Sequence, residues 1–308
     1  MTPATLAARD SAAVFLLEGR THVDVTGADR VAFLNGFCTN DIKSLAPGQS
    51  CEAFFCNVKG HVVAHASLFV SEQSIWLETV PGAAAGLIAH LDRYIIREDV
   101  QLHDRTQTVQ ELIFVGPQCG DALSRWLIAS GHDSLSVVDA TMGTGPLRIH
   151  RVQWLGTESS LVVGSQDNLR PHCTTLGTAA DWEALRIDAG FPTYGVDLTE
   201  DNLPQEAARD AQCISYTKGC YLGQEPIARL HSMGHTNREL RRLTSETATI
   251  PVRGAELLDP ATQHVAGQIT SAAANPFGEG VVALGMVKRN YFTPGTRLQS
   301  AHGEFTVR

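Results

Sequence analysis

The stretch around which this chain is organised is Lys218-Gly-Cys-Tyr-Leu-Gly-Gln-Glu225, followed by Pro226-Ile-Ala-Arg229. It combines an amine, a thiol, an amide, a carboxylate and two glycines, with few side chains that a core would bury. Glycine lets the backbone approach a ligand closely or take positive φ values. A lysine beside a cysteine favours the thiolate, the reactive form of the thiol. The stretch therefore predicts either a reactive site built on Cys220 and Lys218 or a structural turn.

Length and composition indicate an ordinary globular protein. The 308 residues are 43% hydrophobic and 19% charged, which suits about two domains. No apolar run approaches the ~18 residues that would suggest a membrane span. The apolar piece Ala12–Leu17 ends in Glu18 without a small-residue cleavage site, so we expect a buried strand and not a signal peptide. A cytoplasmic location is the expectation.

The charge balance limits the classes of partner. A net charge of −9 argues against nucleic acid or an anionic membrane as a bulk electrostatic partner. Positive charge is nevertheless concentrated between Arg209 and Arg242, where six cations face three acids. This zone predicts either contact with an anionic small ligand or an ordinary solvated face.

The seven cysteines are odd in number, widely spread and free of any C-x-x-C pair. In a chain of this size without a signal sequence, they indicate reduced thiols, most of them small core residues. A metal set of Cys213, Cys220, His231 and His235 is a minor alternative. Structural zinc sites usually pair cysteines two to four residues apart, whereas six residues intervene here.

Hydrophobic periodicity predicts an α+β fold with antiparallel sheets covered by helices. Capping residues predict the helix starts: a capping box at Thr26–Asp29, Pro81, Asp121 and Asp181, the last opening a helix over 182–189 that Gly190 ends. We expect strands at Ala12–Leu17, Thr21–Val25, Ala53–Val58, His61–Val70, Ser74–Val80, Gln110–Gly116, Arg148–Trp154 and Ser160–Gly164.

The pattern changes after about Arg238. Short β-rich pieces separated by proline and glycine turns replace the helix patterns, which predicts a small sandwich or barrel. We place the domain boundary near residue 237, giving an α+β domain over 1–237 and a β domain over 238–308.

The segment Leu185–Asp197 combines a helix end with a turn rich in glycine and proline. Such a loop can present Tyr194 and Asp197 to a flat heterocycle. Taken alone, it is more simply explained as a helix stop of the Schellman type.

Taken together, these stretches resemble the YgfZ family of folate-binding proteins, relatives of the glycine-cleavage T-protein (aminomethyltransferase). The most specific element is Lys218–Glu225, which is the family's signature. The other matching pieces are Phe33-Leu-Asn-Gly-Phe-Cys-Thr-Asn-Asp41, Pro47-Gly48, Asn57-Val-Lys-Gly60, Arg186-Ile-Asp-Ala-Gly-Phe-Pro-Thr-Tyr-Gly-Val-Asp197, Asn202-Leu-Pro-Gln-Glu206 and Gly267-Gln-Ile-Thr-Ser271.

This resemblance implies two intertwined sheet-and-helix subdomains that bind tetrahydrofolate, or a one-carbon derivative, in a central opening, followed by a C-terminal β-barrel. It implies a role in the assembly or repair of iron–sulfur proteins, including those that thiolate tRNA, with such client proteins as partners. No classical enzymatic activity is expected. Cys220 matches the signature cysteine on which that role is expected to depend, and Lys218 accompanies it.

Candidate folate residues follow from the same pieces: Arg186, Asp188, Tyr194, Asp197, Gln224 and Glu225. Arg229 and Lys218 are candidates for pairing with the ligand's glutamate carboxylates, since such charge-assisted contacts are strong.

One departure bears on the alternative function, a folate-dependent aminomethyl transferase. T-proteins carry an aspartate pair after the Lys-Gly turn, and the matching positions here are Ala64 and His65. Acid–base assistance needs a titratable group at the reacting nitrogen. The loss of both carboxylates argues against that chemistry. We interpret His65 as a strand residue facing a polar neighbour. The alternative is a role in proton transfer.

Overall fold

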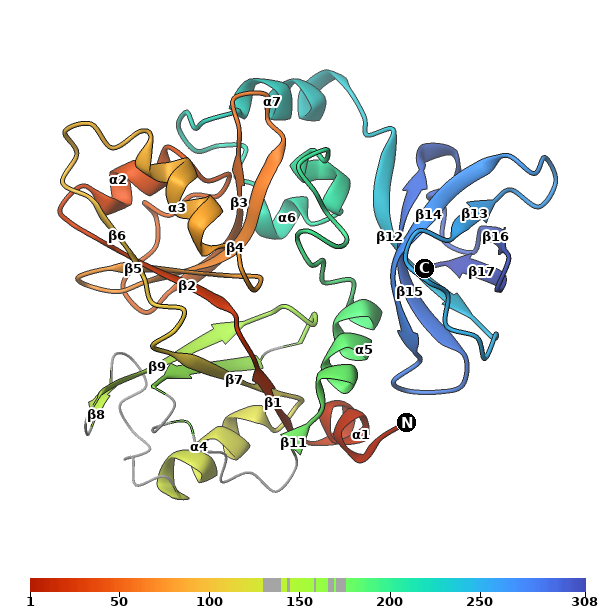
Figure 1. Ribbon diagram of the computed structural model, residues 1–308, viewed down its shortest axis with the longest axis horizontal. Helices are drawn as coiled ribbons and strands as arrows, with labels where there is room; N and C mark the ends of the chain where they lie inside the picture. Colours follow the sequence, from red (N-terminus) through yellow and green to blue (C-terminus); the bar gives the residue numbers. More distant parts are fainter. Residues whose placement is uncertain (130–139, 143–144, 158, 166–168, 170–175) are drawn as a thin grey trace.

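The computed structural model describes residues 1–129, 140–142, 145–157, 159–165, 169 and 176–308. Within them, two antiparallel-type sheets lie beside each other and a β-barrel lies to one side, next to helix α5 (Figure 1). Helix α7 runs along the top of this view, and α1 packs near the foot of α5. Among the described residues, none of the helices combines the length and apolarity needed to traverse a bilayer.

The first sheet has five strands in the order β3-β4-β5-β2-β6. Its apolar face packs against α2 and α3 through Phe33, Leu34, Leu87 and Leu91, which the 3.6-residue period places on one side of each helix. The bounds are β2 (Thr21–Thr26), α2 (Arg30–Asn35), β3 (Ser50–Cys56), β4 (Val62–Val70), β5 (Ile75–Thr79), α3 (Ala84–Asp92) and β6 (Gln101–Asp104).

The second sheet has the order β11-β1-β7-β10-β9-β8, with β11 parallel to β1. Its strands precede and follow those of the first sheet in the chain, so the two units are intertwined as expected. One face packs against α1 and α5, and the other packs against α4. The bounds are α1 (Pro3–Asp10), β1 (Ala13–Leu17), β7 (Gln110–Val115), α4 (Cys119–Ala129), β8 (Ala140–Met142), β9 (Gly145–Val152), β10 (Ser159–Gly164), β11 (Leu176–Gly177) and α5 (Ala179–Ala189).

A connecting region leads to the closed barrel. It contains η1 (Pro204–Ala207), α6 (Asp210–Cys213) and α7 (Gln224–Met233). The barrel has the order β12-β15-β14-β13-β16-β17 and encloses Leu243, Ile269 and Phe305, which confirms the predicted C-terminal β-barrel. Its elements are β12 (Arg238–Ser245), β13 (Glu256–Leu258), β14 (Val265–Ala274), β15 (Val281–Lys288), η2 (Arg289–Tyr291), β16 (Arg297–Ser300) and β17 (Gly303–Val307).

The helix starts differ in detail from the predicted ones. Asp29 is the N-cap of α2 but makes no side-chain cap, so the predicted capping box there is wrong. Helix α5 begins at Ala179, three residues before its predicted start at residue 182, because Thr178 is the N-cap and forms a capping box with Asp181. Helices α3 and α4 begin at Ala84 and Cys119. Gly190 ends α5 as predicted, with a left-handed φ of 80°.

A buried ion pair joins α5 to the barrel. The Arg186 guanidinium donates to Asp197 Oδ2 at 2.9 Å and to Ser271 Oγ at 3.0 Å. Asp197 also accepts hydrogen bonds from the Thr193 amide at 2.9 Å and from the Thr270 and Ser271 hydroxyls, each at 2.6 Å. Both charged side chains are almost fully buried. The carboxylate therefore ties the 191–197 loop to β14.

We predict that Asp197→Asn destabilises the protein by about 1–3 kcal/mol, because the buried Arg186 cation keeps only Glu183 as a paired carboxylate and the hydroxyls of Thr270 and Ser271 lose their charged acceptor. The measurement is the free energy of unfolding in urea. Asp10→Asn is the matched control, since Asp10 forms an exposed pair with Arg9 and should leave the unfolding midpoint unchanged. Equal effects of the two substitutions would contradict the anchoring role.

Candidate functional site

Lys218 attaches its loop to the segment that follows α2 and leads to β3. Its ammonium donates hydrogen bonds to the carbonyl oxygens of Asn35 at 2.7 Å, Cys38 at 2.8 Å and Asn40 at 2.6 Å. Burial lowers the pKa of Lys218, against the opposing effect of nearby acidic groups. An ammonium group has three protons, so these carbonyls use all of them. Segment 35–40 and the 218–223 loop are thus one unit.

The rest of the motif is anchored as well. The ring of Tyr221 is buried against Phe54 and Cys56, and the Leu222 amide donates to the Gly36 carbonyl at 2.9 Å. Gly223 has φ of 79°, and a Cβ there would lie 2.4 Å from the Asn57 carbonyl oxygen. Only glycine fits this contact with the Asn57–Gly60 turn. The motif therefore has a fixed conformation.

Cys220 is the exposed member of the cysteines that the structure describes. Cys38, Cys56, Cys119 and Cys213 are buried and Cys51 is half-buried, whereas Cys173 lies outside the described residues. Burial raises the pKa of the Cys51 thiol to about 12, which leaves it protonated at neutral pH. The loop thus presents one thiol to solvent from a rigid support.

Lys218 was expected to favour the thiolate form of Cys220, but the described structure shows no contact between the two side chains that would do so. The two side chains share no hydrogen bond in the described structure, and the ammonium is fully occupied by the three carbonyls. For the same reason Lys218 is poorly placed to pair with a ligand carboxylate. Its geometry is that of a residue that positions the loop.

We predict that Lys218→Met destabilises the protein by about 1–3 kcal/mol and speeds amide hydrogen exchange in residues 35–40, because three carbonyls lose their charged donor. Cys220→Ser serves as the control and should leave the free energy of unfolding within about 0.5 kcal/mol of the parent. Unchanged exchange in the 35–40 segment of Lys218→Met would count against the anchoring role.

The residues predicted to bind folate do not gather in one cavity. Arg186 and Asp197 form the buried pair that anchors the barrel, and their role as ligand contacts stays a prediction. The Tyr194 hydroxyl donates to the Val62 carbonyl at 3.4 Å, and the Asp188 carbonyl accepts from Arg242 at 3.1 Å. Burial raises the pKa values of both Tyr194 and Asp188.

The remaining three candidates belong to α7. Gln224 is the first residue of the helix, while Glu225 and Arg229 are exposed one turn apart. Both line an open hollow of about 640 Å³ that also contains Tyr216 and Met233. This hollow is a surface feature along the helix, and its lining residue His231 also lines the cavity between α7 and the barrel.

A cavity of about 480 Å³ lies where β3 and β4 of the first sheet meet β9 of the second. Its lining combines aromatic rings, amides, hydroxyls, a carboxylate and a guanidinium. The lining residues are Ser50, Cys51, Glu52, Ser67, Phe69, Arg151, Val152, Gln153, Trp154, Ala211 and Gln212. None of them was predicted as a site residue, because they come from four segments that are separate in the sequence.

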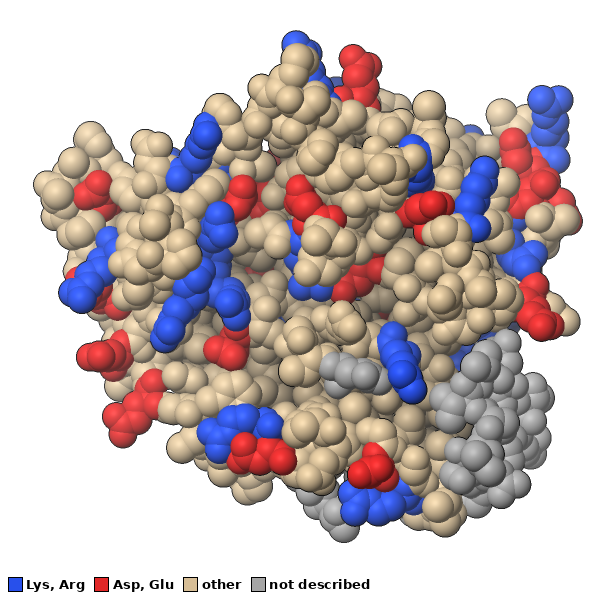
Figure 2. All heavy atoms as spheres, turned by 180° about the vertical axis from the view of Figure 1, so that it is seen from behind, with Lys and Arg blue, Asp and Glu red and all other residues tan. Residues whose placement is uncertain are grey.

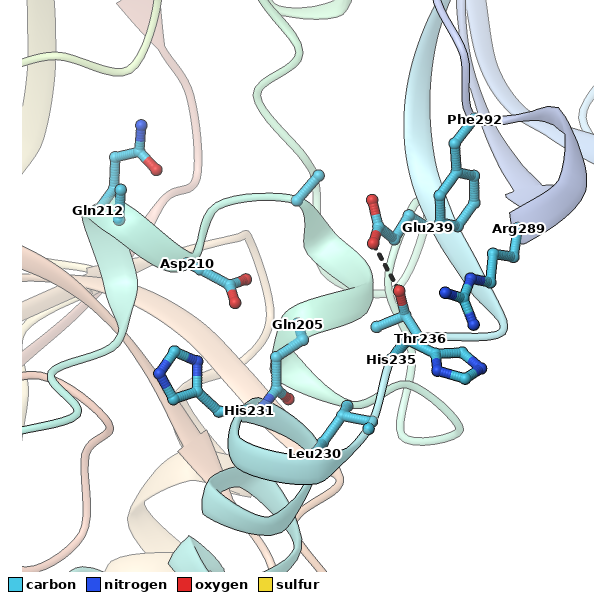
Figure 3. A pocket seen from close by; sticks show the side chains of 13 residues that line it. Gln205, Asp210, Gln212, Leu230, His231, His235, Thr236, Glu239, Arg289 and Phe292 are labelled. Atoms are coloured by element: carbon cyan, nitrogen blue, oxygen red, sulfur yellow. Dashed lines mark hydrogen bonds between the residues drawn. The ribbon is translucent and has the colours of Figure 1, made fainter.

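A second cavity, of about 670 Å³, separates α7 from the barrel (Figure 3). Acidic Asp210 and Glu239 and cationic Arg289 line it together with the rings of His231 and Phe292. The Thr236 hydroxyl donates to Glu239, as the dashed line in Figure 3 marks. The opposed charges favour no single class of anionic or cationic ligand.

Beside the 480 Å³ cavity, four polar side chains form a buried cluster. The Arg209 guanidinium makes a two-pronged contact with Glu52, at 2.6 Å to Oε1 and 3.0 Å from Nε to Oε2. His65 Nε2 lies 3.2 Å from Glu52 Oε2, and the Cys213 thiol lies 3.6 Å from the same oxygen. The interpretation of His65 as a strand residue facing a polar neighbour is confirmed.

Electrostatics fix the charge states of the cluster. Burial opposes ionisation of Glu52, but His65 and Arg209 outweigh it and lower the pKa of the carboxyl to about 2. Burial lowers the pKa of His65 despite the adjacent carboxylate, so the ring is neutral at pH 7. Burial and Glu52 raise the pKa of the Cys213 thiol. The neutral-pH cluster is one ion pair, one neutral imidazole and one thiol.

The cluster does not have the geometry of a nucleophilic triad. Cys213 Sγ and Glu52 Oε2 both approach the same imidazole nitrogen, Nε2 of His65, at 3.7 and 3.2 Å. A triad needs the nucleophile and the carboxylate on opposite ring nitrogens. Nor do Cys213, Cys220, His231 and His235 form the alternative metal set: within the described part of the chain, the converging group is Glu52, His65 and Cys213.

Most of the cations between Arg209 and Arg242 bind partners within the protein. Arg209 pairs with Glu52, Arg238 with Glu206 and Arg241 with Glu239, while Lys218 and Arg242 donate to backbone carbonyls. On the face seen in Figure 2, lysine and arginine side chains are interspersed with aspartate and glutamate. Five of the six cations therefore have partners within the protein, and contact of this zone with an anionic ligand stays a prediction.

Comparison with known proteins identifies the family. Residues 4–213 match the family described as the GCVT N-terminal domain. The chain belongs to this family. Within it, the chain is 30% identical over 243 residues to the tRNA-modifying protein YgfZ of Yersinia pestis (strain Pestoides F), covering 76% of this chain and 72% of that protein. The resemblance to the YgfZ family is thereby confirmed.

Two further similarities bear on the GCVT-family fold. The chain is 27% identical over 283 residues to "Putative transferase At1g60990, chloroplastic" of Arabidopsis thaliana, covering 87% of this chain and 63% of that protein. It superimposes on the glycine cleavage system aminomethyltransferase T of Bartonella henselae with a TM-score of 0.84 and 21% identity, covering 99% of this chain and 87% of that one. This likeness establishes an aminomethyltransferase-like fold.

Proposed function

We propose that the protein binds tetrahydrofolate, or a one-carbon derivative, and supports the assembly or repair of iron–sulfur proteins, including enzymes that thiolate tRNA. The observation that carries this proposal is the exposed Cys220 thiol on a loop fixed by Lys218, Tyr221 and Gly223. The name of the Yersinia relative, a tRNA-modifying protein, supports the direction of the proposal.

The 480 Å³ cavity is our candidate for the folate pocket. Its volume lies in the roughly 300–1,000 Å³ range of small-molecule sites. A pterin is a flat heterocycle whose edge carries amide-like donors and acceptors, and Gln153, Gln212 and Glu52 offer complementary groups. Arg151, exposed in the lining, offers positive charge for the carboxylates of the glutamate tail.

The alternative function, aminomethyl transfer to folate, finds less support. His65 faces this region, but burial lowers its pKa, and Glu52 and Cys213 both approach the same ring nitrogen, Nε2. The ring is therefore a weak acid–base group for a reacting amine. Formation of methylene-tetrahydrofolate from an aminomethyl donor by the purified protein would overturn our preference.

We predict that tetrahydrofolate binds the purified protein with one-to-one stoichiometry in calorimetry, and that Ser50→Trp weakens binding at least tenfold by filling the cavity. Ala228→Trp is the matched control, because Ala228 lines the α7 hollow instead, and its affinity should equal that of the parent. Loss of binding in Ala228→Trp alone would place folate at α7.

We predict that Cys220→Ala fails to restore iron–sulfur enzyme activity under oxidative stress in a strain lacking the native gene, while keeping its tetrahydrofolate affinity. The thiol is the reactive group, and alanine removes it without touching the loop anchors. The variant's unfolding midpoint is compared with the parent's to verify folding. Full rescue by Cys220→Ala would remove the thiol from the proposed role.

A further inference from the structure

Three potential metal ligands converge beside the 480 Å³ cavity. Glu52 comes from β3, His65 from β4 and Cys213 from the end of α6, and their donor atoms all lie within 4.8 Å of one another. The separations are 3.2 Å from His65 Nε2 to Glu52 Oε2, 3.6 Å from Cys213 Sγ to the same oxygen, and 3.7 Å from Sγ to Nε2.

These separations match one triangular face of a tetrahedral zinc site. Zinc binds nitrogen and carboxylate oxygen at about 2.0–2.2 Å and thiolate sulfur at about 2.3 Å. Tetrahedral angles then place nitrogen and oxygen about 3.3 Å apart, and sulfur about 3.5–3.6 Å from either. We infer that Glu52, His65 and Cys213 form a binding site for a borderline divalent cation such as Zn²⁺, with the fourth position left for a water or another ligand.

The donors are held in place before any ion arrives. The ring of His65 stacks on Phe54, with centroids 4.9 Å apart, and Thr39 donates to the Cys213 carbonyl at 2.6 Å. Arg209 fixes the Glu52 carboxylate. Side chains outside the ligand set commonly orient metal ligands in this way. Glu52 also lines the cavity, so the cluster adjoins it.

Ion binding has a defined proton balance. The Cys213 thiol gives one proton to solvent and binds as thiolate, and the His65 ring binds as the tautomer protonated on Nδ1, so that Nε2 offers its lone pair. The site then holds two anionic ligands against a dication, with Arg209 as an outer positive charge. That charge opposes the ion, so we expect a site that exchanges its metal and can be emptied with chelator.

The test uses the full chain, treated with chelator and titrated with Co²⁺. We expect one equivalent to produce thiolate-to-cobalt charge-transfer absorption, and Zn²⁺ to displace it. Cys213→Ser should abolish the charge-transfer band, and His65→Gln should weaken cobalt binding at least tenfold. Cys220→Ser and His231→Gln are the controls and should retain the full band, because both residues lie outside the cluster.

Several outcomes would overturn the inference. Absence of the band in the parent protein excludes the site outright. A band lost in Cys220→Ser but kept in Cys213→Ser would move the metal to the exposed thiol. If Cys213→Ser does not fold, His65→Gln and the two controls still decide. Folate is absent from these titrations, so their result is separate from that of the folate calorimetry.

Discussion

An ammonium group enclosed by three backbone carbonyls is the interaction on which the candidate site depends. Lys218 reaches across from the motif to segment 35–40 and satisfies carbonyls that lie at the end of α2 and in the turn beyond it. Carbonyls left by a helix end need donors, and a charged donor is stronger than a neutral one. The same contact fixes the backbone from which Cys220 projects. A lysine and a cysteine two residues apart thus have separate tasks, anchoring and exposure.

Buried ion pairs also join separate segments elsewhere in the molecule. Arg186 and Asp197 join α5 and its following loop to the barrel, and Arg209 and Glu52 join the α6 region to β3. Such pairs add little net stability relative to apolar packing, but leaving one member alone is costly. Their geometric demands therefore fix how the parts of the chain meet. In this protein, both pairs lie beside the region between the sheets and the barrel.

Local patterns predicted most of the secondary structure. The strands β3 and β4 were expected on either side of Lys59 and Gly60, and the short strands of the barrel were expected from the proline and glycine turns between them. Helix caps were less predictable. Thr178 and Asp181 form a capping box, whereas Thr26–Asp29, which has similar residues, does not. A cap depends on the conformation of the backbone just before the helix. Tertiary contacts, such as the hydrogen bond from the Asp29 amide to the Asp99 carbonyl, change that conformation.

The sequence by itself determined the α+β class, the barrel and the family resemblance, because these rest on periodicity and on contiguous residues. The tertiary structure decided the rest. Arg186 and Asp197 were predicted as folate contacts, and the structure shows that they form a buried ion pair. Glu52 and His65 lie 13 residues apart, and Cys213 lies 148 residues beyond His65, yet their side chains meet. No local pattern encodes such a meeting, since it results from how sheet and connecting helix pack around a shared buried charge.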